Sequence, residues 1–133
     1  MSRLYWTTTA LITAECIGGG IADLLRTPPF YPAMIDLGYP PYLATIMGTA
    51  KLIAAAIVVA PALPRLKEWA YAGITVNLIG AIASHAAMHQ SPSNAIAPGA
   101  FLLLALVSWA TRPSSRMLES REPAHPLRAG ERA

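Results

Sequence analysis

Residues 42–60 read YLATIMGTAKLIAAAIVVA, and residues 66–88 read LKEWAYAGITVNLIGAIASHAAM. Pro61 and Pro64 separate these two apolar stretches, and proline ends a helix because it has no backbone N–H to donate. Each stretch has about 20 residues, the length that a helix rising about 1.5 Å per residue needs to cross about 30 Å of hydrocarbon. The pair therefore predicts two membrane-spanning helices joined by a short turn.

The rest of the chain contributes two similar apolar segments, at residues 5–25 and 95–111. Of the 133 residues, 54% are hydrophobic and 13% are charged, whereas about 25% are charged in a typical soluble protein. So few polar side chains cannot cover a soluble domain, and lipid is the expected solvent. We predict an all-α fold, an integral membrane four-helix bundle at residues 1–111 with spans near residues 5–25, 42–60, 66–88 and 95–111.

Several other classes of protein have no support in the sequence. Lys and Arg flank the apolar segments and do not gather in a patch, so the net charge of +3 does not indicate nucleic-acid binding. The single cysteine, Cys16, excludes an intrachain disulfide and a CxxC pair. A P-loop, a dinucleotide-binding fingerprint, a serine triad, a zinc finger and an EF-hand are all absent from the sequence.

The basic residues are distributed unevenly around the four spans. Both termini and the loop between the second and third spans fall on one side, which carries eight Lys and Arg residues, whereas the other side carries Arg26 alone. The positive-inside rule then places both termini in the cytoplasm. The tail at residues 112–133 mixes Arg, Glu, Ser and Pro without an apolar face, so we expect it to be disordered.

Four motifs between Leu37 and His85 are more specific than the composition: LGYPPYL, GTAKLIAAAIVVAP, PRLKEWAYAG and NLIGAIASH. By these motifs and the order of its spans, the chain resembles the DoxX-like family of small four-span bacterial membrane proteins. The resemblance implies a four-helix fold in the bacterial plasma membrane, the inner membrane of the cell. In the name-giving relative it implies association with a thiosulfate:quinone oxidoreductase. Relatives of the DoxX type often carry an acidic residue where this chain has Lys51.

Three polar side chains from three helices are expected near the membrane midplane. Glu15 lies about 15 Å and Asn77 about 12 Å from the cytoplasmic edge, and Lys51 lies about 14 Å from the outer edge. Because a charge at the bilayer centre costs about 2.5–3.5 kcal/mol, we predict an ion pair of Glu15 with Lys51, with Asn77 satisfying the remaining hydrogen-bonding groups. The pair is either structural, fixing helix register, or catalytic, acting on a ligand or a proton. A third interpretation, in which one group snorkels and the two lie apart, also stays open.

A second polar layer is expected near the outer face. Asp23 lies about 27 Å past Tyr5, and His85 and His89 lie about 24 and 30 Å past Trp69. The four-residue spacing of His85 and His89 occurs in metal and haem sites, but it is a weak signal alone, and we assign no metal. His85 is the third catalytic candidate, with an interfacial hydrogen-bonding role as the alternative. The candidates for ligand binding are Asp23, Asn77, Ser84 and His89.

The outer loop at residues 27–41 contains five prolines together with Phe30, Tyr31 and Tyr39. Two interpretations are equally compatible with this composition. The loop either forms a lid over the mouth of the bundle, or it is stiffened by proline and anchored at the interface by its aromatic rings.

Three functions are compatible with these features, and whether the protein is an enzyme stays open. We favour a small redox-associated membrane subunit that holds a quinone-like or other apolar ligand near His85 and a soluble redox partner on its cytoplasmic side. The alternatives are a membrane-embedded enzyme that uses acid–base residues on an apolar molecule and a structural or ion-relay protein. No cofactor is assigned: quinone is the candidate, and haem or metal is not favoured. The expected partners are the lipid bilayer and the apolar ligand, and a homo-oligomer is compatible with all three functions.

Overall fold

The computed structural model describes residues 2–28 and 30–118 of the chain. Four long helices form the bundle: α1 (Ser2–Leu25), α3 (Tyr42–Val59), α4 (Pro64–Ala87) and α5 (Ile96–Ala110), the last preceded by the 3-10 helix η1 (Pro92–Ala95). With η1 counted as part of the fourth, each is long and apolar enough to cross a membrane. No strand occurs in the described ranges, so the predicted all-α four-helix membrane fold is confirmed.

Prolines set the helix boundaries. Pro41 directly precedes α3, which ends at Val59, two residues before Pro61. Pro64 is the first residue of α4, where its missing N–H removes no intrahelical hydrogen bond. Pro98 lies in the first turn of α5 for the same reason, and the added length of η1 lets this fourth segment reach a spanning length.

Two short helices add to the bundle. Helix α2 (Phe30–Asp36) lies in the outer loop, where we expected no helix, and the 3-10 helix η2 (Ser114–Arg116) follows α5. Helix α2 ends because Gly38 adopts a φ of +87°, and the N–H groups of Gly38 and Tyr39 donate to the carbonyls of Ile35 and Met34. This left-handed glycine is a common way to satisfy the last carbonyls of a helix.

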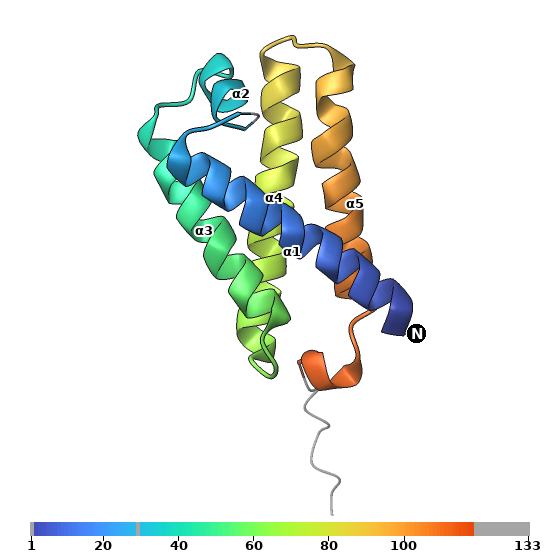
Figure 1. Ribbon diagram of the computed structural model, residues 1–133. Coiled ribbons are helices and arrows are strands. Elements are labelled where there is room, and N and C mark those ends of the chain that lie inside the picture. The colour runs from blue at the N-terminus through green and yellow to red at the C-terminus, as the bar shows by residue number, and fades with distance from the viewer. Residues whose placement is uncertain (1, 29, 119–133) are drawn as a thin grey trace, which may run out of the picture.

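Helices α3, α4 and α5 follow one another as antiparallel neighbours, and α1 crosses them at a tilt (Figure 1). Helix α1 packs on α3 and α5, and α4 packs on the same two helices from the other side. The start of α1, the turn at residues 60–63 and η2 lie together at what we call the terminal end of the bundle. Helix α2 and η1 lie at the opposite end, which we call the α2 end.

Helices α1 and α3 approach most closely at two glycines. A Cβ atom added to Gly48 would stand 2.7 Å from the carbonyl oxygen of Gly20, and one added to Gly20 would stand 3.0 Å from that of Gly48. Glycine is required here because any side chain would push the two backbones apart. This contact brings the polar residues of α1 and α3 within reach of each other.

Candidate functional site

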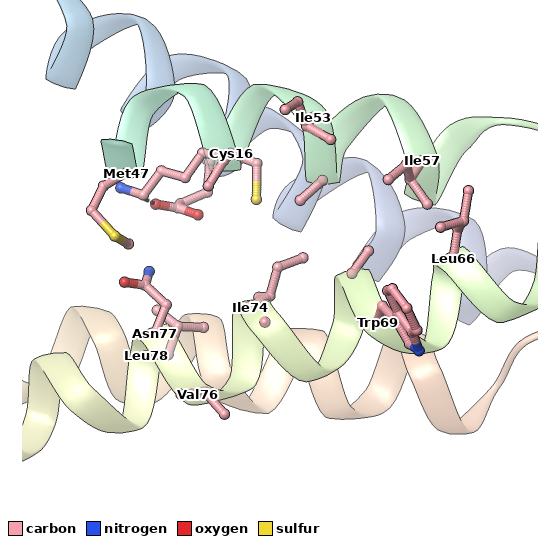
Figure 2. A pocket seen from close by; sticks show the side chains of 16 residues that line it. Cys16, Met47, Ile53, Ile57, Leu66, Trp69, Ile74, Val76, Asn77 and Leu78 are labelled. Atoms are coloured by element: carbon pink, nitrogen blue, oxygen red, sulfur yellow. Dashed lines mark ion pairs between the residues drawn. The ribbon is translucent and has the colours of Figure 1, made fainter. Parts of the chain in front are cut away.

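A cleft of about 570 Å³ lies between α1, α3 and α4 (Figure 2). Lys51 and Asn77 line its α2 end, and Ile57, Leu66 and Trp69 line its terminal end. Apolar side chains make up nearly all of the wall between them. The cleft is thus an apolar space with a polar group of residues at one end.

The cleft opens sideways, between α3 and α4. Among the residues of its wall, Trp69 is 75% exposed, Val76 is 70% exposed and Ile53 is 55% exposed. In a helix that spans a membrane, such exposed apolar side chains face hydrocarbon. The cleft is therefore accessible to molecules dissolved in the lipid.

Three charged side chains, which we call the Lys51 cluster, meet at the polar end of the cleft: Glu15 and Lys51, which line it, and Asp23, which does not. Lys51 Nζ lies 3.1 Å from Asp23 Oδ2 and 3.7 Å from Glu15 Oε1. The side chains are nearly enclosed, with 13% of Lys51, 7% of Glu15 and none of Asp23 exposed. The ring of Phe30, from α2, covers the ammonium group at 4.7 Å.

The structure places the expected polar residues differently from the two predicted layers. Glu15 and Lys51 do meet, but Asp23, which we expected beside the histidines, is the nearer partner of Lys51. Depths counted along each helix treated α1 as upright, whereas it crosses the bundle at a tilt (Figure 1). Asn77 faces the cleft from α4 (Figure 2), and among the described residues no hydrogen bond joins it to Glu15 or Lys51. The bridging role predicted for Asn77 is wrong.

The two histidines lie away from the cleft. His85 Nδ1 donates to Gln90 Oε1 at 2.7 Å, and Asn94 Nδ2 donates to the same oxygen at 3.2 Å. These bonds hold the turn between α4 and η1. His89 lies in that turn with a φ of +52° and is exposed. In the part of the chain that the structure describes, no three His, Cys, Asp or Glu residues are close enough to hold a metal ion.

Ser84 belongs to a contact that closes the outer loop. Its hydroxyl is hydrogen-bonded to the Tyr39 hydroxyl and also donates to the Gly80 carbonyl at 2.7 Å. The segment that carries α2 is thus attached to α4 by Tyr39 and covers Lys51 with Phe30. This geometry favours the lid interpretation of the loop.

A family model described as the DoxX-like family matches residues 7–108, which include the whole cleft and the Lys51 cluster. The chain belongs to the DoxX-like family. Its family and its four apolar helices make it a multi-pass membrane protein in contact with the lipid bilayer. No curated protein and no solved structure matches the chain.

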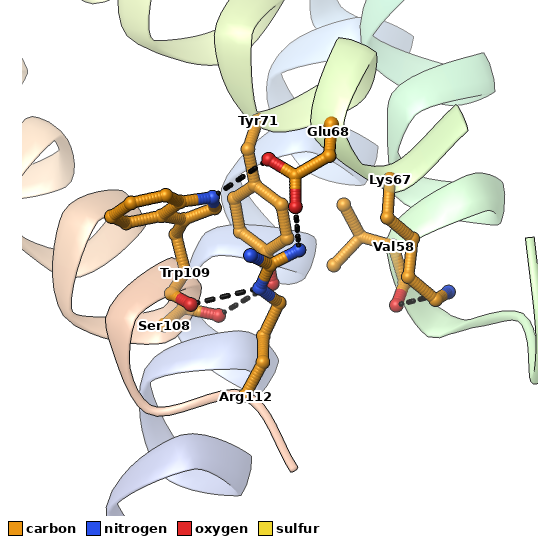
Figure 3. A network of polar contacts seen from close by, with 7 residues as sticks. All are labelled: Val58, Lys67, Glu68, Tyr71, Ser108, Trp109 and Arg112. Atoms are coloured by element: carbon orange, nitrogen blue, oxygen red, sulfur yellow. Dashed lines mark hydrogen bonds and ion pairs between the residues drawn. The ribbon is translucent and has the colours of Figure 1, made fainter. Parts of the chain in front are cut away.

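The terminal end of this DoxX-like protein contains a second polar network, which the sequence had not revealed (Figure 3). Lys67 is completely buried and donates to the carbonyls of Ile57 at 2.6 Å, Val58 at 3.2 Å and Ala60. These carbonyls end α3 and lack partners within the helix. A cation at a helix C-terminus is also favoured by the helix dipole. Lys67 is one of the eight basic residues that the topology argument assigned to one side of the membrane, and the structure shows that it caps α3.

Glu68 joins α4 to the last turn of α5, through Trp109, and to Arg112, which follows α5 (Figure 3). Arg112 Nη1 lies 2.5 Å from Glu68 Oε1, and Trp109 Nε1 donates to Glu68 Oε2 at 3.0 Å. The Arg112 guanidinium lies 5.5 Å from the Tyr71 ring centroid and is 6% exposed. We predicted that the disordered tail begins at residue 112, but residues 112–118 are described and Arg112 is fixed against α4. Residues 119–133 of the predicted tail lie outside the described residues.

Buried hydroxyl groups connect α1, α4 and α5 below this network. The Ser108 hydroxyl is hydrogen-bonded to Thr9 at 2.7 Å and to Tyr71 at 2.8 Å. Together with the Glu68–Arg112 pair, these bonds fix the helices on the side opposite the cleft. The terminal network is therefore structural, and the cleft with the Lys51 cluster is the candidate functional site.

Proposed function

We propose that this DoxX-like protein binds a lipid-dissolved apolar molecule with a polar head, with a quinone-like compound as the candidate, in the cleft between α1, α3 and α4. The observation that carries the proposal is the cleft itself, an apolar space of about 570 Å³ with polar residues at one end. Small-molecule sites usually measure about 300–1,000 Å³ and combine apolar walls with a few placed polar groups.

The distribution of polar groups orients the ligand. Its head would meet Asn77 on α4 and Lys51 on α3, while its apolar part would extend past Ile74 toward Trp69. Asn77 and Trp69 are eight residues apart on α4, about 12 Å along the helix. That length accommodates a single ring with a short side chain, and a longer tail would leave sideways into the lipid.

Two glycines on α4 allow a matched test. Gly73 lines the cleft, Gly80 does not, and at neither position would an added Cβ atom meet another atom within 4 Å. Gly73→Leu therefore adds a side chain to the cleft from a position where the Cβ atom has room, and Gly80→Leu makes the same chemical change outside it. Purified wild type and both variants would be titrated with decyl-ubiquinone, with tryptophan fluorescence as the readout, because Trp69 lines the cleft.

Saturable quenching is expected for wild type and Gly80→Leu, with an affinity weaker by roughly tenfold or more in Gly73→Leu. Equal binding by the two variants, or no saturable binding by wild type, would overturn the proposal of a quinone site in the cleft.

The proposed setting is a redox pathway in the bacterial plasma membrane, with a soluble partner at the terminal end. It is supported by the family and by the basic side chains at that end, which include Arg3, Arg65 and Arg116, against Arg26 at the other. The positive-inside rule makes the terminal end cytoplasmic. Reporter fusions at the two termini test this orientation: activity of periplasmic alkaline phosphatase at either terminus would contradict it.

Catalysis on the bound molecule is a second candidate, because Glu15 and Lys51 both line the cleft and present acid–base groups to its contents. It predicts that Glu15→Gln retains the ligand but no longer converts it. Detection of the same modified product in extracts of wild type and Glu15→Gln would count against catalysis by Glu15.

A further inference from the structure

Two carboxylates share one ammonium group in the Lys51 cluster. Glu15 and Asp23 both lie against Lys51, and among the described residues no other cation pairs with either carboxylate. The cluster therefore has one more carboxylate than ammonium. Such an imbalance is unusual in a membrane-spanning bundle, where an uncompensated charge is costly.

The unmatched carboxylate is Glu15. Asp23 Oδ2 is the nearer partner of Lys51, at 3.1 Å, and none of its side chain is exposed. Neither oxygen of Asp23 accepts a hydrogen bond from a described residue, so Asp23 depends on the ammonium of Lys51 as its counter-ion. Glu15 Oε1 lies 3.7 Å from Lys51 Nζ, beyond hydrogen-bonding distance, and the donor beside it is the thiol of its neighbour Cys16, a weak one.

Glu15 also faces the space in which a ligand would lie. Its side chain is only 7% exposed, yet it lines the cleft. Lys51 also lines the cleft, but it is shared with Asp23, so a positive charge placed beside Glu15 would supply the compensation that the shared ammonium does not. A cation that enters the cleft from the lipid must carry apolar groups around its charge, because both the lipid and most of the cleft wall are apolar.

We propose that the cleft binds lipophilic organic cations in preference to anions of the same size, with Glu15 as the counter-charge. This inference uses the cleft of the proposed function but not its quinone ligand. The matched probes are tetraphenylphosphonium and tetraphenylborate, which have nearly the same shape and opposite charges.

The experiment measures the binding of both ions to purified protein in a non-ionic detergent, by titration calorimetry with empty micelles subtracted. Wild type is expected to bind the phosphonium roughly tenfold or more tightly than the borate. Glu15→Gln should lose this preference. Asp36→Asn removes a charge from an exposed position on α2 and should keep it. Glu15→Asp retains the charge and is expected to retain the preference, which separates loss of charge from loss of fold.

Gly73→Leu should weaken binding of the phosphonium, whereas Gly80→Leu should not, because only the first adds a side chain to the cleft. No preference for the phosphonium in wild type, or an unchanged preference in Glu15→Gln, would overturn the inference. Binding of decyl-ubiquinone without charge preference would leave the proposed function standing and refute only the cation site. A Glu15-dependent preference without quinone binding would do the reverse.

Discussion

Replacing Gly48 by alanine tests the close contact that brings α1 and α3 together. The added Cβ atom would stand 2.7 Å from the carbonyl oxygen of Gly20 and 2.9 Å from Leu24 Cγ, whereas ordinary contacts begin at 3.4 Å. The two helices would have to separate by about 0.7 Å at this point. Gly18→Ala is the matched control, because a Cβ atom there would meet nothing within 4 Å.

The expected magnitude follows from two opposing effects. Alanine is favoured over glycine in a helix by about 1 kcal/mol, and both variants gain this term. Overpacking costs about 1–3 kcal/mol, and only Gly48→Ala incurs it. Gly18→Ala should therefore be slightly more stable than wild type, and Gly48→Ala should be less stable than Gly18→Ala by about 1–3 kcal/mol.

Unfolding by SDS in mixed micelles, followed by circular dichroism, gives the free energy of unfolding of each variant. The displaced helix also carries Glu15 and Asp23, so Gly48→Ala should show a weaker preference for tetraphenylphosphonium than Gly18→Ala. If Gly48→Ala proves as stable as Gly18→Ala, the two backbones do not approach as described, and the geometry of the Lys51 cluster loses its basis.

Two further predictions concern the ends of the bundle. Lys67→Met leaves the last carbonyls of α3 without their buried donor and should lower the free energy of unfolding by about 1–3 kcal/mol. The control, Arg65→Met, is at an exposed position and should change this free energy by about 0.5 kcal/mol or less. Equal effects of the two substitutions on SDS unfolding would contradict the capping role. Tyr39→Phe removes the bond that holds the outer loop to α4 and should speed amide hydrogen exchange in α2 by roughly fivefold. Tyr42→Phe is the control, because Tyr42 is 65% exposed, and it should leave this exchange rate unchanged. An unchanged rate in Tyr39→Phe as well would show that other contacts hold α2.

The spans could be predicted from sequence because they depend on local properties. Where each helix begins and ends along the chain is determined by apolar runs of spanning length and by prolines such as Pro41, Pro61 and Pro64. Neither signal depends on how the helices pack. Glu15 and Lys51 could be paired for a similar reason: two charges at one depth in lipid have few other ways to be compensated.

The cleft and the partner of Asp23 could not be predicted in this way. Both depend on the tilt of α1 and on the angle between α3 and α4, which no residue spacing encodes directly. Lys67 and Arg112 were misjudged because a basic residue near a helix end satisfies the topology rule whether it faces water or caps a neighbouring helix. The sequence PALPRLKEW at residues 61–69 held a signal, since a lysine three residues after Pro64 can reach back to the helix that has just ended.

The most direct measurement of the central claim is the identity of whatever occupies the cleft when the protein is extracted from its own membrane. Wild type, Gly73→Leu and Gly80→Leu would be purified in parallel in mild detergent, and their bound small molecules would be extracted and identified by mass spectrometry. If the cleft is a binding site, one apolar molecule with a polar head will be recovered from wild type and Gly80→Leu and will be lost from Gly73→Leu. Recovery of the same molecules in equal amounts from all three would contradict the claim that the cleft is a binding site.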